Sequence, residues 1–63
     1  MKLFTAIIYT SIPQVGTNQQ FLKYRNIGNL DKFKKFAAMF PGAEYFNLYD
    51  KKTKQFIKRE YLK

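Results

Sequence analysis

The first hydrophobic segment of the chain, residues 3–9, is apolar on both of its alternate faces. It contains Leu3, Phe4, Ile7, Ile8 and Tyr9, most of which favour β-structure. A short run of this kind indicates a central strand that is covered on both sides, at least in part. We expect the strand to end between residues 9 and 12, because residues 11–19 are rich in proline, glycine and other turn formers.

Residues 20–27 predict a return strand, which is joined to the first one by this long hairpin loop. Phe21, Lys23 and Arg25 alternate there with Leu22 and Tyr24. Side chains two positions apart lie on the same face of a strand, so we place Lys23 and Arg25 beside Phe21. One face of this strand is therefore expected to carry two cations next to an aromatic ring.

Hydrophobic residues recur every three or four positions between residues 30 and 40, which predicts a helix. Asn29 is a suitable N-cap, because its side-chain oxygen can accept a hydrogen bond from a free amide of the first turn. Pro41 and Gly42 stop the helix. We assign the apolar stripe to the core: Leu30, Phe33, Phe36, Ala37 and Phe40. The opposite side carries Lys32, Lys34 and Lys35, which are either solvated or bind an anion.

The last third of the chain contains two strand-like runs, residues 43–49 and 55–62, joined by a turn. Asp50 can accept hydrogen bonds from the turn amides, Thr53 can support the same turn, and Lys54 is expected in the left-handed conformation. The segment from Tyr49 to Phe56 resembles the second hairpin of the immunoglobulin-binding domain of protein G. The resemblance covers about eight residues, implies a register for the two strands and implies no function.

The register implied by this turn continues without interruption along both strands. The pairs are then Tyr49 with Phe56, Leu48 with Ile57, Asn47 with Lys58, Phe46 with Arg59, and Tyr45 with Glu60. Alternation divides these residues between two faces. We expect the core face to carry Phe46, Leu48 and Ile57. We expect the outward face to carry Tyr45, Asn47, Tyr49, Phe56 and Lys58.

These elements predict a single α+β domain over residues 1–63, with the ββαββ order of strands and helix. We expect a mainly antiparallel sheet with the one helix packed on one face. Two strand orders stay open. In one, the first and last strands are central neighbours and run parallel, as in a grasp-like fold. In the other, two separate hairpins follow in sequence order.

Composition limits how such a domain is held together. The 63 residues include neither Cys nor His, so a disulfide and a zinc site of the usual ligand types are excluded. Seven Phe and five Tyr can bury large areas instead. We therefore predict a core stabilised by aromatic packing, with no cofactor and no metal.

Catalysis is not expected from this chain. Its four carboxylates are scattered in the sequence; Asp31 has an explanation at the start of the helix and Asp50 has one in the turn, which leaves no acid/base pair. There is no glycine-rich phosphate loop, and a domain of this size has little room for an enzymatic pocket. We predict a binding protein rather than an enzyme.

The charge of the chain indicates the kind of partner. Twelve Lys and Arg against four Asp and Glu give a net charge of +8, which attracts polyanions, although lysines can also serve solubility alone. We predict that the chain binds nucleic acid, single strands in preference, with bases stacked on the outward aromatic side chains and lysines on the phosphates. The candidate site comprises Lys23, Arg25, Tyr45, Tyr49, Lys51, Lys52, Lys54, Phe56 and Lys58.

Other interpretations of the outward face stay open. Tyr49 and Phe56 can be an ordinary cross-strand pair that stabilises the hairpin, or the face can be buried in a homodimer or beneath the first hairpin. The alternative function is a protein-interaction module, such as a small virus-encoded inhibitor or adaptor that docks on an acidic host protein or on its own copy. Membrane binding is not expected, because the apolar stripe of the helix is needed for the core. We expect a cytoplasmic protein, in a cell or in an infected host.

Overall fold

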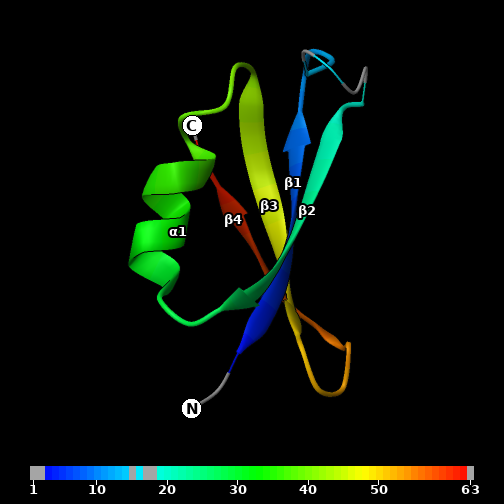
Figure 1. Ribbon diagram of the computed structural model, residues 1–63, viewed down its shortest axis with the longest axis vertical. Coiled ribbons are helices and arrows are strands. Elements are labelled where there is room, and N and C mark those ends of the chain that lie inside the picture. The colour runs from blue at the N-terminus through cyan, green and yellow to red at the C-terminus, as the bar shows by residue number, and fades with distance from the viewer. Residues whose placement is uncertain (1–2, 15, 17–18, 63) are drawn as a thin grey trace.

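The computed structural model describes residues 3–14, 16 and 19–62, so residues 15, 17 and 18 of the predicted hairpin loop lie outside the described part. Four strands and one helix follow one another in the predicted ββαββ order (Figure 1). They are β1 (Phe4–Thr10), β2 (Phe21–Ile27), α1 (Leu30–Ala37), β3 (Ala43–Asp50) and β4 (Phe56–Tyr61). The strands form one sheet and α1 lies to one side of it, which confirms the α+β class (Figure 1).

The strand order of the sheet is β2-β1-β3-β4, and all neighbouring strands are antiparallel. The two hairpins are separate units, as in the second order considered above, but they join through β1 and β3 rather than through β2 and β3. The grasp-like order is wrong, because β4 lies at an edge of the sheet. β2 and β3 run parallel with β1 between them, and α1 is the crossover that this arrangement needs. The helix therefore lies over the face of β1 that buries Ala6 and Ile8.

The helix begins as predicted, because Asn29 caps it by accepting a hydrogen bond at Oδ1 from the amide of Lys32, at 3.0 Å. It ends earlier than predicted, at Ala37, and the next residues form a tight turn in which the amide of Phe40 donates to the carbonyl of Ala37 at 3.3 Å. Within the described ranges, no helix is long and apolar enough to span a membrane.

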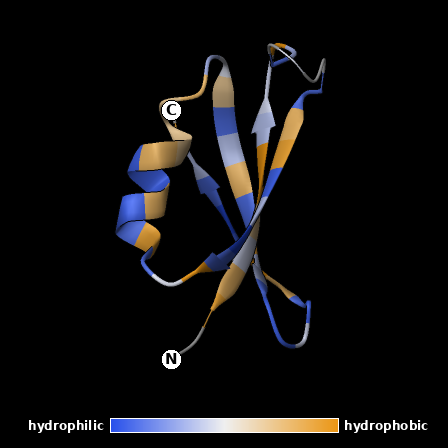
Figure 2. Cartoon of the chain, in the orientation of Figure 1, coloured by the Kyte–Doolittle hydropathy of each residue, from blue (hydrophilic) through white to orange (hydrophobic). Residues whose placement is uncertain are grey.

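Aromatic rings fill the layer between α1 and the sheet. Phe33 of the helix packs edge-on against Phe46 of β3, with ring centroids 5.1 Å apart. The ring centroid of Tyr24 in β2 lies 5.2 Å from that of Phe36 and 6.2 Å from that of Phe40. Hydrophobic and hydrophilic stretches follow one another along β3 (Figure 2). Its two largest buried side chains, Phe46 and Leu48, are two positions apart and so share one face. The buried core consists of Ala6, Ile8, Ile27, Phe33, Ala37, Ala43, Phe46 and Leu48.

The register of β3 and β4 departs from the prediction one residue beyond the turn. Tyr49 pairs with Phe56 as predicted, but Leu48 pairs with Lys58, so Ile57 is the extra residue of a β-bulge. Two residues of β4 then lie opposite one residue of β3, and every later side chain of β4 changes face.

This bulge corrects two predictions about β4. Ile57, expected in the core, is 41% exposed. Lys58, expected on the outward face, lies on the helix side of the sheet, opposite the buried Leu48. Its ammonium pairs there with Glu60 at 3.2 Å. Arg59 takes the outward position instead, opposite Asn47.

Candidate nucleic-acid interface

The side of the sheet opposite α1 is uncovered by any helix of the described residues, and we name it the open face. Strand pairing arranges its side chains in rows that cross all four strands. The open face comprises Thr5, Ile7, Tyr9, Phe21, Lys23, Arg25, Tyr45, Asn47, Tyr49, Phe56, Arg59 and Tyr61.

One of these rows is entirely aromatic and contains one residue from each strand. This aromatic row consists of Phe21, Tyr9, Tyr45 and Tyr61. The rings of Tyr9 and Tyr45 stack with centroids 5.1 Å apart, and Tyr61 lies 5.8 Å from Tyr45. Tyr61 is 63% exposed and Phe21 is 47% exposed. The ends of the row thus offer ring surface to a ligand, while its centre is filled by contacts between the rings.

Arg59 lies against Tyr45 at the centre of this row. Its guanidinium carbon lies 4.5 Å from the centroid of the Tyr45 ring, within the range of a cation–π interaction. Its Nε donates a hydrogen bond to Oδ1 of the buried Asn47 at 2.9 Å. The hydroxyl of Tyr61 beside it raises the pKa of the Arg59 guanidinium. The open face therefore has a positive charge among its tyrosines.

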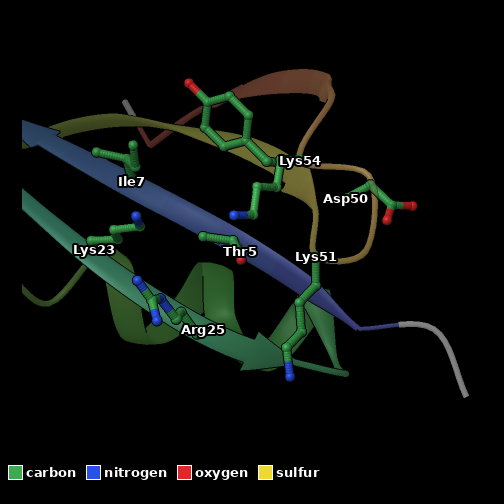
Figure 3. A pocket seen from close by; sticks show the side chains of 8 residues that line it. Thr5, Ile7, Lys23, Arg25, Asp50, Lys51 and Lys54 are labelled. Atoms are coloured by element: carbon green, nitrogen blue, oxygen red, sulfur yellow. The ribbon is translucent and has the colours of Figure 1, made fainter.

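A shallow pocket of about 470 Å³ lies toward the other end of the open face (Figure 3). We name it the basic pocket, because four of the residues that line it are cations. Lys23 and Arg25 belong to β2, on one side of β1, and Lys54 reaches over β1 from the β3–β4 turn on the other side (Figure 3). The lining residues are Thr5, Ile7, Lys23, Arg25, Tyr49, Asp50, Lys51 and Lys54.

The turn between β3 and β4 positions two cations of the pocket, Lys51 and Lys54. Oδ1 of Asp50 accepts hydrogen bonds from the amides of Lys52 and Thr53, at 2.8 and 3.1 Å. Figure 3 shows the Asp50 carboxylate directed away from the Lys54 ammonium. Lys54 has the predicted left-handed conformation, with φ of 64°, and its amide donates to the carbonyl of Asp50 at 2.7 Å. The acidic residue of the pocket is thus engaged by the turn amides.

Lys51 links this turn to the hairpin of β1 and β2 through two hydrogen bonds. Its ammonium donates a hydrogen bond to Oδ1 of Asn26 at the end of β2, and its amide donates to the carbonyl of Leu3 at 3.3 Å. Asn26 has φ of 61°, a conformation that asparagine tolerates better than most residues. The contact from Lys51 to Asn26 crosses the start of β1 and marks one end of the open face.

Most of the predicted site residues come together on this face. Tyr45 lies in the aromatic row, and Phe56, 56% exposed, packs edge-on against Tyr49 with centroids 5.8 Å apart. Lys52 is exposed in the turn and does not line the basic pocket. Lys58 is the misplaced residue, because the bulge puts it on the helix side. The basic pocket contains the remaining five: Lys23, Arg25, Tyr49, Lys51 and Lys54.

Sequence reasoning missed three residues of the site, Tyr9, Arg59 and Tyr61, and gave Phe21 no role. Tyr9 joins the site because β1 is the neighbour of β3, which places it beside Tyr45. That neighbour relation is a property of strand order, on which local patterns carry no information. Arg59 and Tyr61 join it because of the bulge at Ile57. Neither alternate face of β4 is clearly apolar, so its register is weakly specified by the sequence.

The structure bears on two of the interpretations that were left open for the outward face. The first hairpin does not cover this face, since it lies beside the second hairpin in the same sheet. Tyr49 and Phe56 do form a cross-strand pair. Positive charge also occurs on the other side of the molecule, where α1 carries Lys32, Lys34 and Lys35. The helix also carries the 41% exposed ring of Phe36, so what distinguishes the open face is that it combines cations with several exposed rings: Phe21, Phe56 and Tyr61.

The carboxylates lie mostly outside the open face. Asp31 is in the first turn of α1, and Glu60 lies between Lys58 and Lys34, at 3.2 and 3.3 Å. Hydrogen bonds from Lys58 and Lys34 lower the pKa of Glu60. In residues 3–14, 16 and 19–62, no three His, Cys, Asp or Glu side chains are grouped as metal ligands.

The chain matches no family of known proteins, and neither the curated proteins nor the solved structures include one that is significantly similar to it.

Proposed function

We propose that this chain is a non-enzymatic protein that binds single-stranded nucleic acid on the open face. One observation carries the proposal: Arg59 and the basic pocket lie on the same uncovered sheet face as a row of four aromatic side chains. Aromatic rings stack on unpaired bases largely regardless of sequence, and cations beside them contact the phosphates. Both parts of such a site are present here within one sheet.

The residues of the open face have different roles in this proposal. Tyr61 and Phe56 are the stacking residues, because they are 63% and 56% exposed. Tyr9 and Tyr45 stack on each other and so support the row from within. Arg59 contacts a phosphate or the edge of a base from its position over Tyr45.

The exposed rings favour single strands over duplexes. A base in a duplex has both faces covered by its neighbours, so only an unpaired base can stack on Tyr61 or Phe56. The cations then add an affinity that is independent of sequence and depends on salt. We place this activity in the cytoplasm of a cell or of an infected host, where RNA offers unpaired bases.

A second candidate function is favoured by the composition of the β4 edge. β4 is an edge strand, and Phe56, Ile57 and Tyr61 along it are all exposed. Edge strands can add a strand from another chain. The partner would be a second copy or an acidic protein, as for a small virus-encoded inhibitor or adaptor. Light scattering after gel filtration tests the second copy directly, since a dimer would double the mass.

The deciding experiment is a titration of a fluorescently labelled single-stranded oligonucleotide at several salt concentrations. Duplex DNA and heparin are the comparators. We expect micromolar or tighter binding that prefers the single strand, with the logarithm of the affinity falling linearly with the logarithm of salt at a slope of about 0.7 for each phosphate contact. Affinities that follow polyanion charge alone, or no binding near physiological salt, would overturn the proposal and favour a protein partner.

A further inference from the structure

We infer that the basic pocket binds the terminal phosphate group of a single strand, so that the protein recognises a strand end. The inference rests on the proposed function and adds which part of the nucleic acid the pocket takes. It follows from three properties of the pocket: its charge, its position at one end of the open face, and its distance from the aromatic row.

The charge of the pocket suits a dianion. Lys23, Arg25, Lys51 and Lys54 line one space of about 470 Å³. The carboxylate there belongs to Asp50. Its Oδ1 accepts hydrogen bonds from two turn amides, and Figure 3 shows it directed away from Lys54. A terminal phosphate monoester carries about two negative charges at neutral pH, because its second pKa is about 6. A bridging phosphodiester carries only one charge, so the cluster of cations discriminates between the two.

The pocket also lies at one end of the open face. The ammonium of Lys51 in the β3–β4 turn donates a hydrogen bond to Asn26 of β2, and its amide donates to the carbonyl of Leu3. These contacts lie just beyond Thr5 and Tyr49, where the sheet ends. A strand that lies along the sheet from the aromatic row therefore reaches the pocket last. A strand that continued past the pocket would leave the sheet and its cations.

The distance to the aromatic row fits a short oligonucleotide. Thr5 and Tyr49 at the pocket are four residues from Tyr9 and Tyr45 along β1 and β3, which is about 13 Å at the rise of an extended strand. Arg59 lies beside Tyr45 and opposite Asn47, between the two ends of this path. A strand with a base on Tyr61 can thus pass Arg59 and place its terminal phosphate among the lysines.

The test compares three short oligonucleotides of one sequence: 5′-phosphorylated, 3′-phosphorylated and with both ends unphosphorylated. One of the phosphorylated strands should bind about tenfold more tightly than the unphosphorylated one, because the added charge gains a surface ion pair from each of several cations. Whichever phosphorylated oligonucleotide binds more tightly shows which end of the strand lies in the basic pocket, and so gives the polarity of the bound strand. Equal affinities for all three, with single-strand binding intact, would overturn end recognition and leave the proposed function standing. Absence of binding to all three would overturn both.

Two variants of the same turn provide a matched control. Lys54→Gln removes one cation of the pocket and should reduce the preference for the phosphorylated strand by about twofold, because one of the several surface ion pairs is lost. Lys52→Gln removes an exposed cation two residues away that does not line the pocket, and it should leave the preference unchanged. Both residues are exposed, so circular dichroism should show folded variants. If Lys52→Gln reduces the preference as much as Lys54→Gln does, the phosphate responds to the general field of the turn and the pocket is not its site.

Discussion

Arg59 lies over the ring of Tyr45, with 4.5 Å between the guanidinium carbon and the ring centroid. This relationship exists only because Ile57 forms a β-bulge, which moves Arg59 to the open face and Lys58 to the helix side. Two cations that are adjacent in the sequence therefore have opposite environments. Arg59 contacts Tyr45 and Asn47, whereas Lys58 contacts Glu60.

The first prediction uses this pair of neighbours. Arg59→Ala should weaken single-strand binding by about 1.5 kcal/mol, the scale of a hydrogen bond to a charged group. It should also lower the salt slope by about 0.7 if Arg59 contacts one phosphate. Lys58→Ala should change both quantities much less, because Lys58 is on the far side of the sheet. Anisotropy titrations at several salt concentrations measure both, and a larger effect of Lys58→Ala would contradict the placement of the site.

The second prediction concerns base stacking by Tyr61, the most exposed ring of the aromatic row. Tyr61→Leu keeps an apolar side chain and removes the aromatic surface, so we expect a loss of about 1 to 3 kcal/mol in binding, the value of one stacked base. Phe36→Leu is the control, since Phe36 is a partly exposed ring on the helix and should leave the affinity unchanged. Equal affinities of Tyr61→Leu and the unmodified chain would remove Tyr61 from the interface.

The predicted elements were found because each rests on residues that act locally. Asn29 caps the helix through its own side chain, and Asp50 and Lys54 form the turn within five residues of chain. Such features need no knowledge of the rest of the fold. The pairing of Tyr49 with Phe56 was predictable for the same reason, since the turn determines the first pair beyond it.

The part of the site that was predicted incorrectly depends on interactions between segments that are distant in the sequence. The bulge at Ile57 reverses the faces of Lys58 and Arg59. Both alternate faces of β4 mix apolar with charged residues, so no burial pattern specifies one register. Tyr9 became part of the site only through the pairing of β1 with β3. Three of the four residues of the aromatic row were consequently outside the predicted site, while all but one of the predicted cations lie on the open face or in the turn beside it.

The third prediction tests the junction between the helix exit and the end of β1. Gly42 has φ of +76°, and a Cβ there would lie 2.7 Å from Cγ1 of Ile12 and 3.0 Å from Oγ of Ser11. Gly42→Ala should therefore lower the free energy of unfolding by about 1 to 2 kcal/mol for the left-handed backbone and by about 1 kcal/mol or more for the contact.

Gly16→Ala is the matched control for this prediction. Gly16 has φ of +95°, and a Cβ there would meet nothing within 4 Å. Gly16→Ala should therefore lower the free energy of unfolding only by the contribution of the left-handed backbone. Urea unfolding followed by circular dichroism gives both values. A Gly42→Ala variant no less stable than Gly16→Ala would show that the chain near Ile12 moves aside without cost.

The last prediction concerns pH, and Glu60 supplies its direction. Lys58 and Lys34 lower the pKa of Glu60 in the folded state, from a reference value of 4.5, because they stabilise the carboxylate. A lowered folded pKa stabilises the protein fully above the unfolded pKa, and this stabilisation is lost as the pH falls through the folded pKa. The difference in unfolding free energy between the unmodified chain and Glu60→Gln should thus be constant at neutral pH and shrink below about pH 4.5.

Adding salt at neutral pH should reduce the same difference, since the pairs are exposed to solvent. Urea unfolding at neutral pH and at about pH 3 measures the change. A difference that stays the same at both pH values would mean that Glu60 stabilises the chain through contacts other than these ion pairs.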